Sequence, residues 1–164
     1  MKFLEKDLET IIFEADNSVL QSRGLDINGK KIRQLYLGNY GRCDLIAYFR
    51  QNGALHVTIY ELKQEKIDIS AVHQIIKYRH GVISFLKQRN RYFNAEVNAV
   101  LIGNDIDKKS TFPLLLNQVG WLSAYTYNYE IDGLKFELVP YLSLVDEGFY
   151  GHEKPKPIRD TMPF

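Results

Sequence analysis

Hydrophobic and polar positions recur with two different periods along the chain, which predicts a mixture of helices and strands. Leu4, Leu8, Ile11 and Ile12 recur at the spacing of one helix face. Runs that alternate or stay apolar, and are rich in β-branched and aromatic residues, indicate strands instead. The pattern predicts helices over 2–15, 70–88 and 113–124, and strands over 32–38, 43–50, 54–63, 96–103, 125–130 and 134–139.

Turn and capping residues separate these elements. Asn52-Gly53 favours a two-residue type I′ hairpin, and Asp132-Gly133 predicts a second hairpin near the C-terminal end. Residues 16–31 are predicted to form a loop with one helical turn near Val19-Leu20. Asp68 or Ser70 is the expected N-cap of the helix over 70–88, and Pro113 suits the first turn of the helix over 113–124.

The order of these elements predicts an α/β fold with a mixed β-sheet core flanked by helices, an additional C-terminal β-hairpin and an extended tail. We expect residues 1–140 to form a single domain. Residues 141–164 are aromatic and rich in Pro, so we expect an arm that packs on the surface or on a partner.

The first hairpin places two carboxylates opposite each other. If Asn52 and Gly53 form the turn, Gln51 pairs with Ala54, and the same register sets Asp44 against Glu61. Opposed Cβ atoms lie about 4.5–5.5 Å apart, and like charges in that position destabilise a sheet. A cation would relieve the repulsion, and hard Mg²⁺ or Mn²⁺ suits two carboxylates.

Lys63 follows Glu61 by two residues, so the period of a strand places its ammonium group on the same face. Two metal-binding carboxylates with an adjacent ammonium group form a set suited to phosphodiester hydrolysis. The simpler interpretation is a strand end open to water, with Lys63 as a salt-bridge partner.

Composition limits the class of protein. The chain has 164 residues, 45% of them hydrophobic, enough for one domain with a sizeable core. No apolar stretch approaches the ~18 residues of a membrane span, and the first residues do not resemble a signal peptide. The single Cys43 cannot form an internal disulfide and is expected to be a small core residue. We therefore expect a cytoplasmic protein with no membrane partner.

Basic residues are unevenly distributed, although the net charge is only +1. Residues 1–110 hold 17 basic and 13 acidic residues, whereas residues 111–164 hold four basic and seven acidic ones. The stretch from 77 to 91 contains no acid and five bases: Lys77, Arg79, Lys87, Arg89 and Arg91. It predicts either a solvated helix face or a track for a phosphate backbone, with Lys30, Lys31 and Arg33 as another candidate track.

The order of elements and their residues resembles the PD-(D/E)xK nuclease superfamily, which includes type II restriction endonucleases, archaeal Holliday-junction resolvases and phage exonucleases. The resemblance covers about residues 2–103: a helix with Glu5, a hairpin with Asp44, then Glu61-Leu62-Lys63 and a following helix. Gln74 and Tyr78 match the Gln-x-x-x-Tyr motif of one exonuclease-like branch. Cys43 stands where the motif's name has Pro, a position that members often vary.

The resemblance implies a restriction-endonuclease-like fold and a role for each matched residue. Asp44, Glu61, Lys63 and Glu5 would be catalytic, and Asp44, Glu61, Glu5 and the backbone carbonyl of Leu62 would hold Mg²⁺ or Mn²⁺. Whether Glu5 or Glu9 completes the site stays open. Gln74, Tyr78 and the bases from 77 to 91 would bind nucleic acid, although Gln74 could be a surface residue and Tyr78 a core residue.

The expected function is metal-dependent hydrolysis of phosphodiester bonds, with DNA favoured over RNA. One alternative is a nucleic-acid-binding module that keeps the fold without catalysis. Another is an assembly subunit that uses the aromatic tail. The resemblance also admits a homodimer or a larger nuclease complex.

Overall fold

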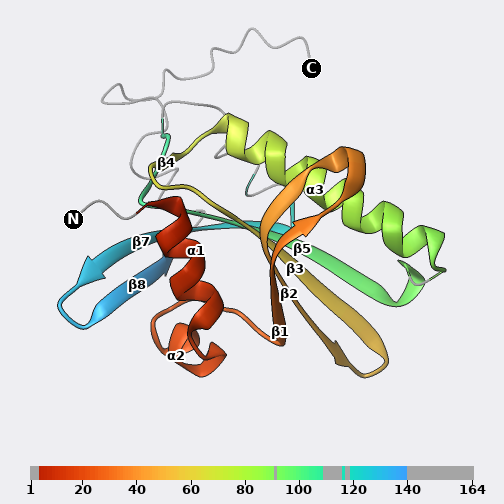
Figure 1. Cartoon of the computed structure of the whole chain (residues 1–164), viewed down its shortest axis with the longest axis horizontal. Helices are drawn as coiled ribbons and strands as arrows, with labels where there is room; N and C mark the ends of the chain where they lie inside the picture. Colours follow the sequence, from red (N-terminus) through yellow and green to blue (C-terminus); the bar gives the residue numbers. More distant parts are fainter. Residues whose placement is uncertain (1–3, 91, 109–115, 117–118, 140–164) are drawn as a thin grey trace, which may run out of the picture.

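The computed structural model describes residues 4–90, 92–108, 116 and 119–139, which form a mixed six-stranded sheet between helices (Figure 1). The strand order is β1-β2-β3-β5-β7-β8. These strands are β1 (Lys30–Tyr36), β2 (Arg42–Gln51), β3 (Ala54–Leu62), β5 (Ala95–Gly103), β7 (Leu122–Glu130) and β8 (Gly133–Leu138). The predicted α/β fold with a mixed, helix-flanked sheet is therefore confirmed.

Helices cover both faces of the sheet. The helices are α1 (Glu5–Glu14), α2 (Asn17–Ser22) and α3 (Ile69–Gln88), with 3-10 turns η1 (Gly38–Tyr40) and η2 (Tyr92–Asn94). Helix α3 packs against Val57 and Ile59 of β3, whereas α1 packs against Tyr60 and Leu62 of the same strand. A separate two-stranded sheet joins β4 (Lys66–Ile67) and β6 (Asp105–Ile106) in parallel. Among the described helices, none is both long and apolar enough to cross a membrane.

Strands β2 and β3 adopt the predicted hairpin. Asn52 and Gly53 have φ angles of 51° and 79°, the left-handed values that a type I′ turn requires. Gln51 pairs with Ala54, and the ladder continues in that register to Leu45 and Tyr60. The Asp68 side chain accepts a hydrogen bond of 3.0 Å from the Ala71 amide, which confirms the predicted N-cap of α3.

Parallel pairing overturns one predicted helix boundary. The helix expected over 113–124 is wrong from Val119 onward, because residues 119–121 form a turn and β7 begins at Leu122. Leu122 and Ala124 pair with Ala99 and Leu101 of β5. Burial against β5 outweighs the local helical pattern. Residues 113–115 and 117–118 lie outside the described residues, as does the predicted arm over 141–164.

The second hairpin and the first loop also differ slightly from the prediction. Glu130 pairs with Gly133, so the turn between β7 and β8 consists of Ile131 and Asp132, one residue earlier than predicted. The single helical turn expected near Val19-Leu20 is the six-residue helix α2.

Both edges of the sheet are protected against further strand pairing. Strand β1 carries Lys30, Lys31 and Arg33, and charged side chains on an edge strand discourage pairing. Beside β8, the backbone carbonyl of Arg23 accepts a hydrogen bond of 2.8 Å from the Phe136 amide. Charge therefore discourages pairing at β1, and the residue after α2 accepts one backbone hydrogen bond from β8.

Two glycines with similar backbone angles provide a matched test of the close approach of Gly29 to β2. Gly29 has φ +84° and a Cβ there would lie 2.1 Å from the Tyr48 carbonyl oxygen, whereas Gly53 has φ +79° with nothing within 4 Å. Gly53→Ala should lower the free energy of unfolding by about 1–2 kcal/mol through left-handed strain. Gly29→Ala should cost roughly 1–3 kcal/mol more, because the backbone must also shift. Urea denaturation measures both, and equal losses would contradict the close approach of Gly29 to β2.

Candidate active site

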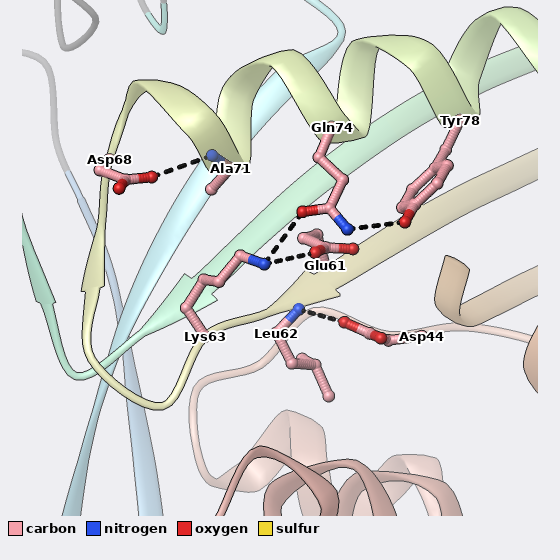
Figure 2. A network of polar contacts seen from close by, with 8 residues as sticks. All are labelled: Asp44, Glu61, Leu62, Lys63, Asp68, Ala71, Gln74 and Tyr78. Carbon is pink, nitrogen blue, oxygen red and sulfur yellow. Dashed lines mark hydrogen bonds and ion pairs between the residues drawn. The ribbon is translucent and has the colours of Figure 1, made fainter. Parts of the chain in front are cut away.

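The candidate site lies where β2 and β3 separate (Figure 2). The β2–β3 ladder ends at Leu45 and Tyr60, one pair before Asp44 and Glu61. Here the Asp44 carboxylate accepts a hydrogen bond of 2.8 Å from the Leu62 amide, so a side chain takes the place of a backbone partner. The hairpin register thus brings both predicted carboxylates to one end of the sheet.

Glu61 is the most deeply buried acid of the site. Its side chain is only 1% exposed, and its Oε1 accepts a hydrogen bond of 2.7 Å from the Lys63 ammonium group. Its second oxygen, Oε2, is buried and has no hydrogen-bond partner among the described residues. Buried acceptors nearly always have a partner, so this oxygen is suited to a ligand.

Helix α3 adds two further polar residues to the site. Lys63 donates a second hydrogen bond, of 3.1 Å, to Oε1 of Gln74, and Nε2 of Gln74 donates one of 2.7 Å to the Tyr78 hydroxyl (Figure 2). Gln74 and Tyr78 are four residues apart and therefore lie on one helix face. Tyr78 is also a buried core residue, and a Cβ on Gly41 would lie 3.2 Å from its ring. The Gln-x-x-x-Tyr pair therefore orients Lys63.

Burial controls the charges of the two carboxylates. It raises the pKa of Asp44 to about 6, against the opposing effect of the Leu62 amide. It raises the pKa of Glu61 to about 8, and the charge of Asp44 adds to this rise while Lys63 opposes it. Burial alone would lower the pKa of Lys63, but its contact with the Glu61 carboxylate produces a net rise, so the ammonium group stays charged.

Helix α1 brings two further acids toward the site in different ways. Glu5 is exposed, and its negative charge contributes to the raised pKa values of both Asp44 and Glu61. Glu9 is buried and accepts a hydrogen bond from Gln34, and its charge acts on Asp44. Gln34 was not predicted to lie near the site, because its φ of 54°, unusual within a strand, leaves no signal in the sequence.

The bases predicted to contact nucleic acid have different surroundings. Arg79 donates a hydrogen bond of 2.9 Å to the Val97 carbonyl, and its guanidinium carbon lies 4.1 Å from the centroid of the Trp121 ring. These contacts favour a packing role against β5 and the segment before β7. Lys77 and Lys87 are exposed on α3, and Arg89 lies 5.1 Å from the Phe85 ring. Phosphate contacts by these residues stay a prediction, and Arg91 lies outside the described residues.

Two bases of the other candidate track hold α1 in place. The Lys31 ammonium group donates to the Ile12 carbonyl at 2.9 Å and also to the Ala15 carbonyl, at the C-terminal end of α1. A cation there complements the helix dipole. The Arg33 guanidinium lies 4.9 Å from the Phe13 ring. These two residues therefore have structural roles.

The donor set fits a hard cation, although it is incomplete on its own. No group of three or more His, Cys, Asp or Glu residues within the described parts of the chain is arranged to hold a metal ion. Mg²⁺ is, however, usually bound by one or two carboxylates together with water and substrate phosphates. Glu61, whose Oε2 has no partner in the described part of the chain, and the adjacent Asp44 supply two carboxylates. The Leu62 carbonyl and Glu5 stay predicted ligands.

Comparison with solved structures supports the fold. The chain is similar to the crystal structure of a repair endonuclease from Pyrococcus abyssi, with a TM-score of 0.52 and 22% sequence identity. The match covers 77% of this chain and 47% of that chain, so this chain spans about half the length of the solved structure. No protein-family model and no curated protein matches the sequence. At this identity the likeness shows a shared fold.

The raised pKa of Glu61 predicts how the stability of the metal-free protein depends on pH. Between the ordinary value of 4.5 and about 8, the folded protein holds a proton that the unfolded chain has lost. The free energy of unfolding should therefore fall as pH rises through this range in EDTA. In Glu61→Gln this fall should be smaller, and the variant should melt above wild type at pH 8.

Thermal unfolding between pH 5 and 9 measures the effect. Glu137→Gln, which changes an exposed acid on β8, serves as the control and should follow wild type. A wild-type melting temperature with the same pH dependence as Glu61→Gln would show that Glu61 titrates normally.

Proposed function

We propose that the chain is a metal-dependent nuclease that hydrolyses phosphodiester bonds in DNA and belongs to the PD-(D/E)xK superfamily. The observation that carries the proposal is the buried Glu61, whose Oε2 has no partner among the described residues, with Asp44 and Lys63 beside it. The similarity of the fold to that of a repair endonuclease supports it.

The two carboxylates would hold Mg²⁺ or Mn²⁺. A bound ion would lower the pKa of a water molecule and neutralise negative charge on the phosphate. Asp44 is held in place by the Leu62 amide, so its remaining oxygen has a defined direction. Glu61 is held through Oε1, which leaves Oε2 for the ion.

Lys63 would orient the nucleophile or stabilise the charge that develops on the phosphate. An ammonium group has three donors, and Glu61 and Gln74 accept two of them in the described structure. The third would serve an oxygen of the substrate. Because Gln74 is in turn bonded to Tyr78, the ammonium group is oriented before substrate binds, which favours electrostatic stabilisation of the transition state.

A binding module without catalysis explains these features less well. Burying two adjacent carboxylates destabilises a fold, as their raised pKa values indicate. Backbone binding to nucleic acid needs basic residues and gains nothing from buried acids. The arrangement therefore favours a nuclease over a binder.

Loss of either carboxylate should abolish metal-dependent cleavage. Asp44→Asn and Glu61→Gln keep the shape of each side chain but remove the charge that holds the ion. Linear, branched and single-stranded DNA incubated with Mn²⁺ measures the activity, and circular dichroism confirms folding. Glu5→Gln and Glu9→Gln in the same assay show which α1 residue completes the site. Full activity in Asp44→Asn or Glu61→Gln would refute the proposal.

Lys63→Ala should lower the turnover rate far more than the affinity for DNA. Removing a group that stabilises the transition state typically lowers the rate by about 10²–10³-fold. Single-turnover rates and dissociation constants separate the two effects. Lys66→Ala, at an exposed lysine three residues along, should leave both unchanged. Equal losses of rate and affinity in Lys63→Ala would identify an ordinary phosphate contact.

A further inference from the structure

A largely apolar cleft with a volume of about 590 Å³ lies between β1, η1, β2 and α3. Its size is within the range of sites that hold a small ligand or part of a larger one. We name it the aromatic cleft for the rings of Tyr36, Tyr40, Tyr48 and Phe85 in its lining, which also includes Arg50 and Val82. In Figure 1 the segment between β1 and β2, drawn in orange, runs beside α3. Leu37 and Tyr40 of this segment line the aromatic cleft.

Two large apolar side chains that line the aromatic cleft are unusually exposed to solvent. Tyr36 is 68% exposed and Phe85 is 51% exposed, although both line a concave surface. Exposed apolar groups gathered in a cleft commonly mark a binding site. Flat aromatic rings are also the groups on which nucleobases stack without regard to sequence.

The walls of the aromatic cleft carry positive charge. Among the described residues, no acid lines the cleft. Arg50 lines the cleft, and the Arg89 guanidinium lies 5.1 Å from the Phe85 ring. An apolar floor with basic surroundings is complementary to a nucleobase attached to a phosphate backbone.

A second cavity, of about 860 Å³, has the opposite character. It lies beside the segment after Lys63, and its lining includes one base, Lys66, and four acids: Glu65, Asp68, Asp105 and Asp107. These acids would repel a phosphate backbone. A nucleic-acid strand that leaves the candidate active site is therefore favoured to run toward the aromatic cleft.

The candidate active site and the aromatic cleft are connected through α3. Tyr78, which orients Gln74, packs against Gly41, and Tyr40 of the cleft wall packs against Gly81 one turn farther along α3. Gln74 and Phe85 are eleven residues apart on this helix, which is about 16 Å. That length corresponds to at most about five nucleotide steps of 3.4 Å.

We infer that the aromatic cleft binds an unstacked nucleobase of a single-stranded segment, a few nucleotides from the phosphodiester held at Asp44 and Glu61. The inference rests on the proposed nuclease function and narrows it to substrates with unpaired nucleotides. Tyr36 and Phe85 supply the stacking surface, and the basic side chains of Arg50 and Arg89 attract the phosphate backbone of the nucleic acid. A duplex end without unpaired nucleotides would leave the cleft empty.

Binding of a fluorescent oligothymidylate of about 15 nucleotides in EDTA tests the inference. Tyr36→Ala and Phe85→Ala should each weaken binding by about 5- to 150-fold, the effect of losing one stacked base. Affinity for a blunt duplex should not change. The slope of log affinity against log salt should also stay the same, because stacking releases no counterions.

Control variants separate stacking from other effects. Tyr36→Phe keeps the ring and should bind as wild type does, and Tyr129→Ala, at a 58% exposed tyrosine beside the acidic cavity, should have no effect. A 2-aminopurine placed along the oligonucleotide should lose fluorescence on wild type at one position. Tyr36→Ala should restore that fluorescence.

Three outcomes would overturn the inference: alanine variants within twofold of wild type, equal losses on duplex and single strand, or unchanged affinity with an altered oligomeric state. The last would identify the cleft as a contact between copies of this chain. Cleavage with Mn²⁺ is measured in parallel. A wild-type protein that binds the oligonucleotide through the cleft but cuts no DNA would refute the nuclease proposal and leave the base-binding site standing.

Discussion

The burial of Glu61 beside Asp44 is the constraint on which the site depends. Two carboxylates removed from water favour their protonated forms, and only opposing charges or donors return them to the ionised state. The Leu62 amide provides this for Asp44, and Lys63 provides it in part for Glu61. Because Oε2 of Glu61 remains without a partner in the described structure, this oxygen is suited to a ligand such as the proposed metal ion.

The surrounding fold keeps this strained arrangement in place. Strand β3 lies in the middle of the sheet, paired with β2 on one side and β5 on the other, so the position of Glu61 is defined by two ladders. Helix α3 begins at the Asp68 cap and directs Gln74 and Tyr78 toward Lys63. The core thus supplies the free energy that the buried acids cost.

The surface around the site is divided by charge. The acidic cavity lies beside the segment that follows Lys63, whereas the lining of the aromatic cleft includes Arg50 and, among the described residues, no acid. This division is hidden in the small net charge of the whole chain. For the proposed nucleic-acid substrate, it would favour a path toward the aromatic cleft, since repulsion by the acidic cavity and attraction by Arg50 would act together.

Local sequence was sufficient to predict the hairpin that carries Asp44 and Glu61, whereas the start of β7 depends on long-range packing. Asn52-Gly53 and the two-residue period of strands are properties of one contiguous hairpin, so the register that brings Asp44 toward Glu61 was predictable. The start of β7 at Leu122 was not, because it depends on pairing with β5 more than twenty residues earlier.

Side-chain contacts outside the hairpin could not be predicted from local sequence either. The contact of Gln34 with Glu9 and that of Arg79 with Val97 and Trp121 join residues from different elements. Nothing in either residue's own neighbourhood indicates such a partner. Sequence by itself determined the fold class and the set of polar groups at the hairpin end, because turns, caps and periodicity are local. Only the tertiary structure decided which acid of α1 is buried and which bases serve packing, because burial is set by the whole core.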